Sequence, residues 1–285
     1  HGALRIYPDH AGQITAACGV LVNRDQGLGA DYRGNVFVCE PPGNLVHRRI
    51  LMPDGVTFRS ERARDGVEFL ASPDDWFRPV NLTLGPDGSL YVVDMYRAVI
   101  EHPHWLPEDL AEKLPLNAGN DRGRIYRISK SESSSQRDSE TRSRTGGHQL
   151  ANRSNGQLVS ILEHSNSWWR ETAARLIYER QDTSIVDRLE TLAVKGTRAV
   201  SRIHAIWALD GLGKLTKQHV LTALIDSNPR VREHAVRLSE RYLSTCTELR
   251  SRVIQLARDS DMRVRWQVAL RSEERRVGKG CRSRW

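Results

Sequence analysis

Long apolar runs, metal-binding cysteine motifs and a leader segment are all missing from this 285-residue chain. No stretch of about 18 consecutive apolar residues occurs, so the sequence predicts no transmembrane helix. The four cysteines form no Cys-x-x-Cys motif, which excludes a zinc knuckle and a haem attachment site within this chain. The chain opens on His1 rather than methionine and shows no signal peptide, so we expect a fragment of a longer protein.

The net charge of +8 is unevenly distributed and does not by itself indicate a nucleic-acid partner. Residues 1–149 carry −2, residues 150–270 carry +6 and the last fifteen residues carry +4. A nucleic-acid-binding protein needs basic side chains gathered on one face, not merely a positive total. The sequence therefore predicts no nucleic-acid partner.

Two β hairpins of similar sequence lie 54 residues apart. Asn35–Arg48 aligns without a gap on Ser89–His102, and a Gly-Pro-Asp-Gly turn at 85–88 joins two apolar strands in the second unit. Four-stranded units that repeat every 40 to 55 residues or so are typical of β-propeller blades. The simpler alternative is two unrelated hairpins with similar turns. The predicted strands are 14–22, 35–39, 44–51 and 56–59 in the first unit, and 80–84, 90–94, 98–101 and 124–128 in the second.

A serine-rich, charged segment at 129–149 separates this half from a helical half. Four helices begin with similar motifs at spacings of 32, 30 and 33 residues, each with an arginine three residues before a small apolar residue. Helix pairs at this period form an α-solenoid, and the motifs resemble HEAT repeats. We expect the four motif arginines to form an internal ladder with acidic side chains. The motifs are Trp169–Ala173, Ser201–Ala205, Val231–Ala235 and Val264–Val268.

The predicted fold class is therefore mixed β and α, with about two blades of a partial β-propeller followed by a HEAT-like α-solenoid. The predicted domains are residues 1–128 (propeller), 129–149 (flexible linker), 150–271 (solenoid) and 272–285. The last segment shows no apolar face and resembles non-native read-through, so it is left out of the fold prediction.

The sequence also predicts a disulfide between two cysteines of the first hairpin. If Val22 pairs with Asn35, antiparallel register places Cys18 opposite Cys39, at a separation that suits a disulfide. Such a bridge would indicate an oxidising compartment. The alternative is a pair of small core residues.

In a propeller, the loops before the first strand and after the second strand of each blade open on one face around the axis. We expect a polar mouth there, suited to a small molecule or a redox cofactor. The alternative is that Glu40 and Asp94 cap loop amides and that Arg78 pairs structurally with Asp94. No metal ligands are assigned. The candidate residues are His10, Glu40, Arg78, Asp94, Tyr96 and Arg97.

Two long strings carry a resemblance to a known family: YRGNVFVCEPPGNLVHR at 32–48, and FRPVNLTLGPDGSLYVVDMYR at 77–97, followed by EHPHW. They resemble the so-called membrane-bound dehydrogenase domain proteins of planctomycetes. That family joins a glucose- or sorbosone-dehydrogenase-like propeller to HEAT repeats and often to a cytochrome-c-type domain. The resemblance is specific over residues 1–128 and generic over residues 150–270.

The resemblance implies a periplasmic or extracellular dehydrogenase that oxidises a sugar or related alcohol, with HEAT repeats as scaffold. It implies pyrroloquinoline quinone and calcium as cofactors, and a cytochrome-c-type domain as a partner of the HEAT region. Two blades cannot close a ring, so we expect this chain to be inactive alone. The alternative function is a non-catalytic module that binds glycans or proteins.

Overall fold

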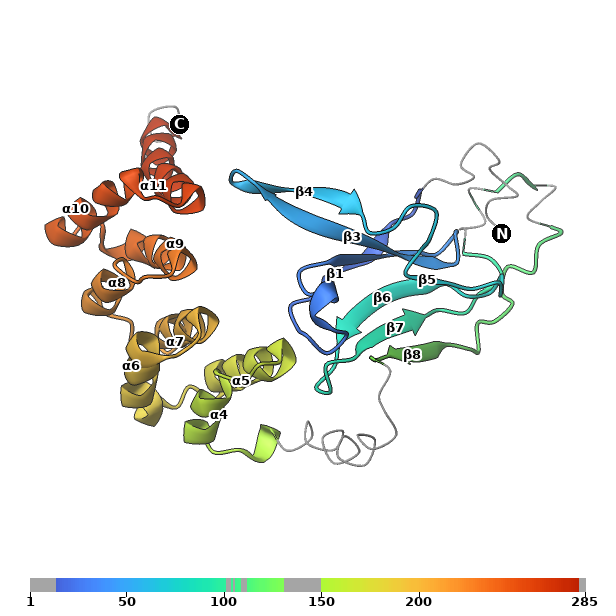
Figure 1. Ribbon diagram of the computed structural model, residues 1–285, viewed down its shortest axis with the longest axis horizontal. Helices are drawn as coiled ribbons and strands as arrows, with labels where there is room; N and C mark the ends of the chain where they lie inside the picture. Colours follow the sequence, from blue (N-terminus) through green and yellow to red (C-terminus); the bar gives the residue numbers. More distant parts are fainter. Residues whose placement is uncertain (1–13, 101–103, 105, 109–111, 131–149, 282–285) are drawn as a thin grey trace. The chain divides into compact units, whose positions relative to one another are not determined.

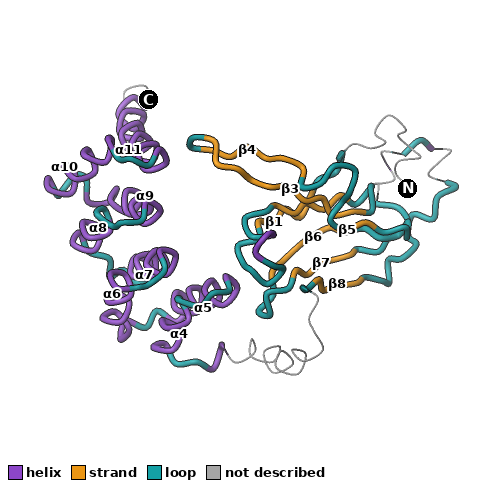
Figure 2. The backbone as a smooth tube through the Cα atoms, in the orientation of Figure 1, coloured by secondary structure: helices purple, strands orange, loops and turns teal. Residues whose placement is uncertain are grey.

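The computed structural model describes residues 14–100, 104, 106–108, 112–130 and 150–281, with side chains up to residue 271. The chain divides into two compact units. The β unit comprises residues 1–52 and 59–144, and the helical unit comprises residues 53–58 and 145–285. Figures 1 and 2 show that the strands precede the helices along the chain. The mixed β and α class is confirmed, and each unit is described by itself.

The first sheet of the β unit, sheet A, is an antiparallel meander with the predicted four strands. Its order is β1-β2-β3-β4, and a short fifth strand pairs with β3. Strand β1 begins at Cys18 and is shorter than predicted, because the amides of Thr15 and Ala16 bind the Glu40 side chain. Within β1, Gly19 adopts a φ of 55° and the register shifts between Cys18 and Leu21. The strands are β1 (Cys18–Val22), β2 (Val36–Glu40), β3 (Leu45–Asp54), β4 (Thr57–Arg62) and β5 (Leu70–Ala71).

The second sheet, sheet B, has the order β6-β7-β8 and is antiparallel throughout. The predicted turn joins its first two strands: Gly88 has a φ of 76°, and the Asp87 carboxylate accepts a hydrogen bond from the Ser89 amide at 3.1 Å. This geometry agrees with the Asp-Gly turn chemistry of the sequence. The strands are β6 (Pro79–Leu84), β7 (Leu90–Asp94) and β8 (Arg124–Ile128).

The predicted strand at 98–101 is wrong over its described part. Ala98–Ile100 lie outside any strand, Glu101 lies outside the described residues, and β8 pairs with β7 instead. Tyr96 turns the chain away from the sheet with a φ of 51°. The Arg78 guanidinium then binds the carbonyl oxygens of Arg97 and Ala98 at 3.1 and 3.0 Å. These two carbonyl oxygens accept hydrogen bonds from a side chain and not from a neighbouring strand. The structural similarity between the two aligned segments therefore ends after β7.

One hydrophobic core joins the two sheets face to face. Phe37 and Cys39 of β2 enter it from sheet A, and Leu90 and Val92 of β7 enter it from sheet B. All four side chains are fully buried. Because successive residues of a strand point to opposite faces, each sheet has one face in this core and one face outside it.

The 54-residue alignment relates these faces to one another. Tyr91 and Val93 are the counterparts of Phe37 and Cys39, yet they lie on the face of sheet B that is outside the core. We call the face of each sheet that carries these four positions the front face, and the opposite face the back face. The front of sheet A therefore packs against the back of sheet B. Two similar units that follow one another in the same orientation pack in this way.

Close backbone approach between the sheets requires glycine at Gly27. A Cβ atom there would lie 2.1 Å from the carbonyl oxygen of Gly88, in the turn between β6 and β7. We expect Gly27→Ala to destabilise the β unit by about 1 to 3 kcal/mol, because the backbone must shift to admit the methyl group. Hydrogen exchange of β-unit peptides measures the effect. Gly123→Ala is the control, since its Cβ would lie 3.7 Å from its nearest neighbour; equal protection in both variants would contradict the close approach.

Eight α-helices lie in the described part of the helical unit, in two layers (Figure 1). Helices α5, α7, α9 and α11 pack in succession along one layer, and α4, α6, α8 and α10 along the other. The α-helices are α4 (Asn155–Ile161), α5 (Ser167–Arg180), α6 (Val186–Lys195), α7 (Ala199–Gly211), α8 (Lys217–Ala223), α9 (Pro229–Leu238), α10 (Thr247–Gln255) and α11 (Met262–Cys281). Short 3₁₀ turns occur at Ala30–Tyr32 in the β unit and at Thr183–Ile185, Ser239–Tyr242 and Leu256–Arg258 here.

The repeated motifs begin the helices as predicted. The side chains of Asn166 and Asn228 accept hydrogen bonds from Trp168 and Arg230 amides at 2.8 and 2.9 Å, which confirms both as N-caps. Asp261 likewise accepts from the Arg263 amide at 2.9 Å. Helix α11 continues through the predicted boundary at residue 272.

The fixed alanine positions of the motifs lie in the core of the helical unit. Ala173, Ala205 and Ala235 are fully buried, and Val268 in the fourth motif is 9% exposed. A methyl group at these positions lets neighbouring helices approach closely. In the described residues, no helix is both long and apolar enough to cross a membrane.

Candidate functional site

The candidate carboxylate of sheet A, Glu40, is 2% exposed and binds the backbone just before β1. Its Oε1 accepts hydrogen bonds from the amides of Thr15 and Ala16 at 3.1 and 3.2 Å. The Thr15 hydroxyl donates to the same oxygen at 3.3 Å. Glu40 therefore caps loop amides, as the alternative in the sequence analysis held.

Asp94 occupies the matching place in sheet B and is 1% exposed. Its Oδ1 accepts from the amides of Arg78 and Tyr96 at 2.8 and 2.9 Å. Its Oδ2 is buried and has no hydrogen-bond partner among the described residues. Oδ1 therefore holds two backbone amides in place, and Oδ2 remains able to accept a hydrogen bond.

Arg78 is the largest fully buried side chain and does not form an ion pair with Asp94. Its Nε, Nη1 and Nη2 donate to the carbonyl oxygens of Arg97, Pro41 and Ala98 at 3.0 to 3.1 Å. Burial lowers the pKa of the guanidinium, and nearby carboxylates, Asp94 among them, oppose that change. The Arg78 guanidinium thus joins the end of β2 to the turn after β7. Asp94 does contact Arg78 as the structural alternative held, but the contact is a hydrogen bond from the Arg78 backbone amide.

Arg97 holds the loop that precedes β8. Its Nη1 binds the carbonyl oxygens of Gly119 and Arg122, the latter at 2.8 Å, and its Nη2 binds Asn120 at 3.2 Å. In these contacts the guanidinium binds no carboxylate; it holds the segment between β7 and β8 in place through three carbonyl oxygens. The loop would be left with several unpaired carbonyls if Arg97 were removed.

Tyr96 is the strained member of the set. A positive φ is unusual for a bulky residue and indicates a constraint imposed by the surroundings. Its ring lies 5.5 Å from that of Trp76, and the Arg124 guanidinium lies 3.6 Å from the ring centroid on a surface of the sheet. Arg124 also donates to the Tyr126 hydroxyl at 3.1 Å. The cluster joins the turn after β7 to the first residue of β8.

The structure brings Arg78, Asp94, Tyr96 and Arg97 into one network, with Glu40 one residue from the Arg78 contact at Pro41. His10 lies outside the described residues. Among the described residues, no three His, Cys, Asp or Glu side chains are grouped as a metal ion would require.

The predicted disulfide is not formed: Cys18 and Cys39 both carry free thiols. The predicted opposition of the two residues is confirmed by the strand register. The register shifts between Cys18 and Leu21, and the Cys18 sulfur lies 4.0 Å from the carbonyl oxygen of Pro79 in sheet B. Burial raises the pKa of the Cys18 thiol, and burial together with Cys18 raises that of Cys39 to about 12. Such thiols are protonated at neutral pH and are poor nucleophiles.

Sequence reasoning did not identify Asn44, which links the two sheets. Its backbone is left-handed, with a φ of 56°, and its side-chain amide donates to the Phe77 carbonyl at 2.6 Å. Asparagine tolerates this conformation better than most residues. The Pro-Pro-Gly-Asn run that precedes β3 was the available signal.

The arginine ladder of the helical unit is confirmed for its two central members. Arg202 binds Asp226 through Nε and Nη2 at 2.7 and 2.8 Å. Arg232 binds Asp259 in the same fork geometry, with both distances at 2.8 Å. Each pair joins one repeat to the next, and bidentate contacts of this kind are the stronger type of ion pair.

The two outer arginines use the backbone. Arg170 donates to the carbonyl oxygens of His164 and Ser165, and Arg265 donates to those of Asp259 and Ser260, at 2.6 to 3.1 Å. Gly196 occupies the place in the second repeat that Asp226 and Asp259 occupy in the next two. The motif arginines are therefore engaged within the helical unit and do not present a free basic stripe.

Acid is expected to weaken the helical unit through these carboxylates. The hydrogen bonds from Arg232 lower the pKa of Asp259. A depressed folded-state pKa contributes stability above the unfolded-state value, about 3.9, and this contribution is lost as pH falls through the folded value. We expect the thermal midpoint, followed by circular dichroism at 222 nm, to fall below about pH 4. Asp259→Asn should flatten this slope, whereas exposed Asp187→Asn should keep it; identical profiles for both would contradict the assignment.

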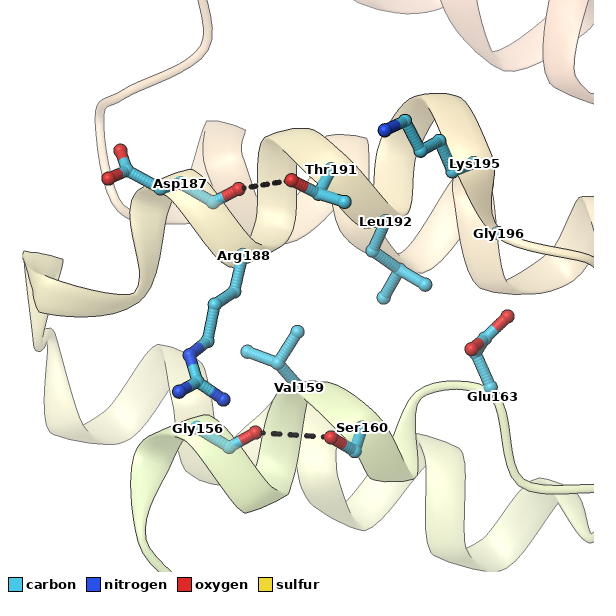
Figure 3. A pocket seen from close by; sticks show the side chains of 10 residues that line it. All are labelled: Gly156, Val159, Ser160, Glu163, Asp187, Arg188, Thr191, Leu192, Lys195 and Gly196. Carbon is cyan, nitrogen blue, oxygen red and sulfur yellow. Dashed lines mark hydrogen bonds between the residues drawn. The ribbon is translucent and has the colours of Figure 1, made fainter.

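A pocket of about 390 Å³ lies between α4 and α6 (Figure 3). Val159 and Leu192 lie between its two ends, and the Arg188 side chain extends from α6 towards Gly156 of α4 (Figure 3). A Cβ on Gly156 would lie 3.0 Å from the guanidinium, so glycine gives Arg188 room to cross. Glu163 lies at the opposite end. The pocket therefore offers an apolar centre with a cation at one end and a carboxylate at the other.

Hydroxyl groups and a second cation complete the pocket wall. Ser160 and Thr191 donate to the carbonyl oxygens one turn earlier, Gly156 at 3.4 Å and Asp187 at 2.9 Å (Figure 3). Lys195 lines the same pocket on α6. Both hydroxyl oxygens keep acceptor capacity towards a bound group. This arrangement suits non-covalent binding, since no nucleophile–base pair is present among these side chains.

Residues 2–132 match the model of a family described as a domain of unknown function, DUF7133. The match covers the strands of the β unit and ends before α4. No curated protein and no solved structure matches the chain.

Proposed function

We propose that this chain is the framework of a larger dehydrogenase-like protein and that its own role is to bind and hold partners. One observation carries this proposal: the candidate side chains of the β unit are committed to the main chain. Glu40 accepts hydrogen bonds from backbone amides, Arg78 donates to three carbonyl oxygens, and Arg97 donates to the carbonyl oxygens of the loop before β8. Side chains already saturated in this way position backbone and have little capacity left for a substrate.

The β unit, in this proposal, consists of two consecutive blades of a β-propeller. The support is the direction of packing, front of sheet A on back of sheet B, between two sheets whose second strands align at a constant offset. Propellers repeat such contacts around an axis. The helices then form a HEAT-type α-solenoid, supported by the two layers and by the arginine ladder between repeats.

The solenoid is the proposed partner-binding part. The pocket between α4 and α6 has apolar, cationic and anionic groups in a row, which suits an extended peptide segment of a protein partner. The family resemblance makes a cytochrome-c-type domain the proposed partner and the periplasm or cell exterior the proposed location. A nucleic acid is not the proposed partner, because the motif arginines bind acids and carbonyls within the helical unit.

A sugar or alcohol dehydrogenase is the second candidate, and Asp94 favours it. A buried carboxylate oxygen without a partner beside a strained tyrosine is a feature of functional sites. The described residues do not by themselves fit pyrroloquinoline quinone and calcium. Calcium takes six to eight oxygen ligands or so, whereas one free carboxylate oxygen is present, and both guanidiniums are engaged by carbonyls. Catalysis would need residues from elsewhere in the protein.

Dye-linked turnover separates the two candidates. The full chain is assayed with aldoses and alcohols in the presence of added pyrroloquinoline quinone and calcium. We expect no turnover above the protein-free blank, because Glu40, Arg78 and Arg97 are already bound to the main chain. Turnover that disappears in Asp94→Asn, while Glu108→Gln retains it, would instead establish the dehydrogenase reading.

A further inference from the structure

Arg188 of α6 is a cation to which the described residues of the helical unit supply no anion. Its side chain extends towards α4 and lies against Gly156 (Figure 3). Within the part of the chain that the structure describes, its guanidinium forms no hydrogen bond and no ion pair. The motif arginines Arg202 and Arg232, by contrast, bind carboxylates in fork geometry. The donors of Arg188 are therefore available to the carboxylate of a ligand.

Glycine at the facing position of α4 admits the Arg188 guanidinium between the two helices. A Cβ atom on Gly156 would lie 3.0 Å from Nη1 of Arg188. Glycine is a weaker helix former than alanine by about 1 kcal/mol, and Gly156 lies within α4. The space that a side chain would fill on α4 is thus occupied by the guanidinium, at some cost to the helix.

A second hollow, of about 470 Å³, adjoins the pocket of Figure 3 at Arg188. Gly156, Ser160 and Arg188 line both hollows, and the hydroxyl-bearing Ser154 and Ser184 line the second one. We call the two hollows together the α4–α6 groove. It has a polar half, an apolar half and a cation where the halves meet. Since α4 and α6 are neighbours within one layer, the groove lies between two helices of the unit and is not an end of it.

The carboxylates near this groove are bound or directed elsewhere. Glu163 accepts hydrogen bonds from the Thr197 amide and hydroxyl at 3.0 and 3.3 Å. Asp182, in the turn before α6, accepts from the backbone amide two residues later at 2.9 Å. Asp187 extends away from α4 (Figure 3). A ligand can therefore supply the anion that Arg188 lacks.

The spacing of the lining residues sets the sequence that would fit the groove. Leu192 follows Arg188 by one helical turn, so their side chains start about 5 to 6 Å apart, and Leu192 faces Val159 of α4 (Figure 3). In an extended chain, residues i and i+2 point to the same side and lie about 6.5 Å apart, whereas adjacent residues point to opposite sides. An acidic residue on Arg188 and an apolar residue on Leu192 would therefore be two positions apart.

We propose that the α4–α6 groove binds an extended segment of a partner protein in which an acidic residue lies two positions from an aliphatic residue. The acidic side chain pairs with Arg188, and the aliphatic side chain enters the hollow between Val159 and Leu192. An internal segment fits better than a chain end, because the groove continues on both sides of Arg188. The inference rests on the partner-binding role proposed above and names the sequence that this role selects.

Selection of a phage-displayed library of random octapeptides on the immobilised full chain tests the proposal. We expect enrichment of Asp or Glu two positions from Leu, Ile, Val or Met. Selection on Arg188→Glu should enrich Lys or Arg at the acidic position instead, because the charge in the groove is reversed. Arg188 is exposed and unbonded among the described residues, so folding should be retained, as circular dichroism at 222 nm would check. Arg252→Glu, at an exposed arginine of α10 in the same layer, is the matched control and should select the same peptides as the parent chain.

Gly156→Ala separates loss of binding from loss of folding. The added methyl group should displace the guanidinium and weaken binding of the fluorescein-labelled consensus peptide, measured by fluorescence anisotropy, by about tenfold or more. The thermal midpoint should be unchanged or higher, because alanine is the better helix former. Unchanged affinity in this variant would count against the placement of the acidic side chain on Arg188.

The selection also distinguishes the two ways of failing. Enriched peptides that lack an acidic residue, end in a required C-terminal carboxylate, or keep their acidic preference on Arg188→Glu would overturn this inference and leave the partner-binding role in place. The absence of any enriched peptide on the parent chain would overturn the inference together with the partner-binding role of the solenoid.

Discussion

Replacing Arg78 with methionine is expected to unfold the β unit or to destabilise it severely. Methionine keeps the apolar stem but leaves the buried carbonyl oxygen of Pro41 and the half-buried carbonyl oxygens of Arg97 and Ala98 without their donors. Each unsatisfied buried group costs about 1 to 3 kcal/mol, so the combined loss should be at least about 3 kcal/mol. Hydrogen exchange followed by mass spectrometry measures it as lost protection in peptides spanning β2, β6 and β7.

Arg124→Met is the matched control for Arg78→Met. Arg124 lies at the same end of sheet B but is exposed. Its contacts are a cation–π interaction with Tyr96, a hydrogen bond to the Tyr126 hydroxyl and an exposed ion pair with Asp74 at 3.5 Å. Exposed contacts of these kinds contribute about 1 kcal/mol or less. The transition at 222 nm, which reports the helical unit, should be unchanged in both variants. Equal protection of the β-unit peptides in the two variants would show that Arg78 does not hold the sheets together.

Replacing Arg232 with methionine is expected to cost about 3 to 5 kcal/mol, because it removes one partner of a largely buried ion pair. Asp259 would keep its charge with its side chain only 6% exposed, and the carbonyls of Asp226 and Ser227 would lose their donor. Since the pair joins adjacent repeats, we expect unfolding of α9–α11 at lower denaturant concentration than that of the preceding helices. Urea titration followed at 222 nm measures the change.

The double variant Arg232→Met with Asp259→Asn separates the pair from the packing of the arginine stem. Removing both charges should cost less than the sum of the two single changes, because neither charge is left buried alone. Arg175→Met is the exposed control: its i,i+4 pair with Glu179, at 3.4 Å, should contribute about 0.5 kcal/mol or less. Additive losses in the double variant would mean that Arg232 acts through packing alone.

Local sequence pattern predicted most elements because their causes are local. The Gly-Pro-Asp-Gly turn, the N-caps at Asn166 and Asn228, and the strand 90–94 each depend on a few adjacent residues. The opposition of Cys18 and Cys39 was also predictable, since a short connection limits the register of a hairpin. The same residues did not predict that both thiols stay free and that the Cys18 sulfur lies beside the Pro79 carbonyl of the other sheet.

The sequence predicted which residues lie together in the candidate site, but it did not predict what each side chain binds. Sequence reasoning placed Glu40, Arg78, Asp94, Tyr96 and Arg97 near one another, and four of them share a network. Whether a guanidinium faces a substrate or a carbonyl depends on which backbone groups are left unpaired nearby. Those groups belong to segments far apart in the sequence, such as Pro41 beside Arg78.

The amino-acid sequence by itself determined the order of a strand-rich half and a helix-rich half, the 54-residue relation between the two hairpins and the spacing of the motif arginines. Alternation of apolar residues, turn chemistry and helix capping are short-range properties, so they can be read from neighbouring residues. Only the tertiary structure decided that β8 rather than residues 98–100 pairs with β7 and that the front of sheet A covers the back of sheet B. It also decided that one Asp94 oxygen has no hydrogen-bond partner within the part of the chain that the structure describes. Each of these outcomes depends on which distant backbone and side-chain groups satisfy one another once water is excluded, and that competition is resolved only when the chain has folded.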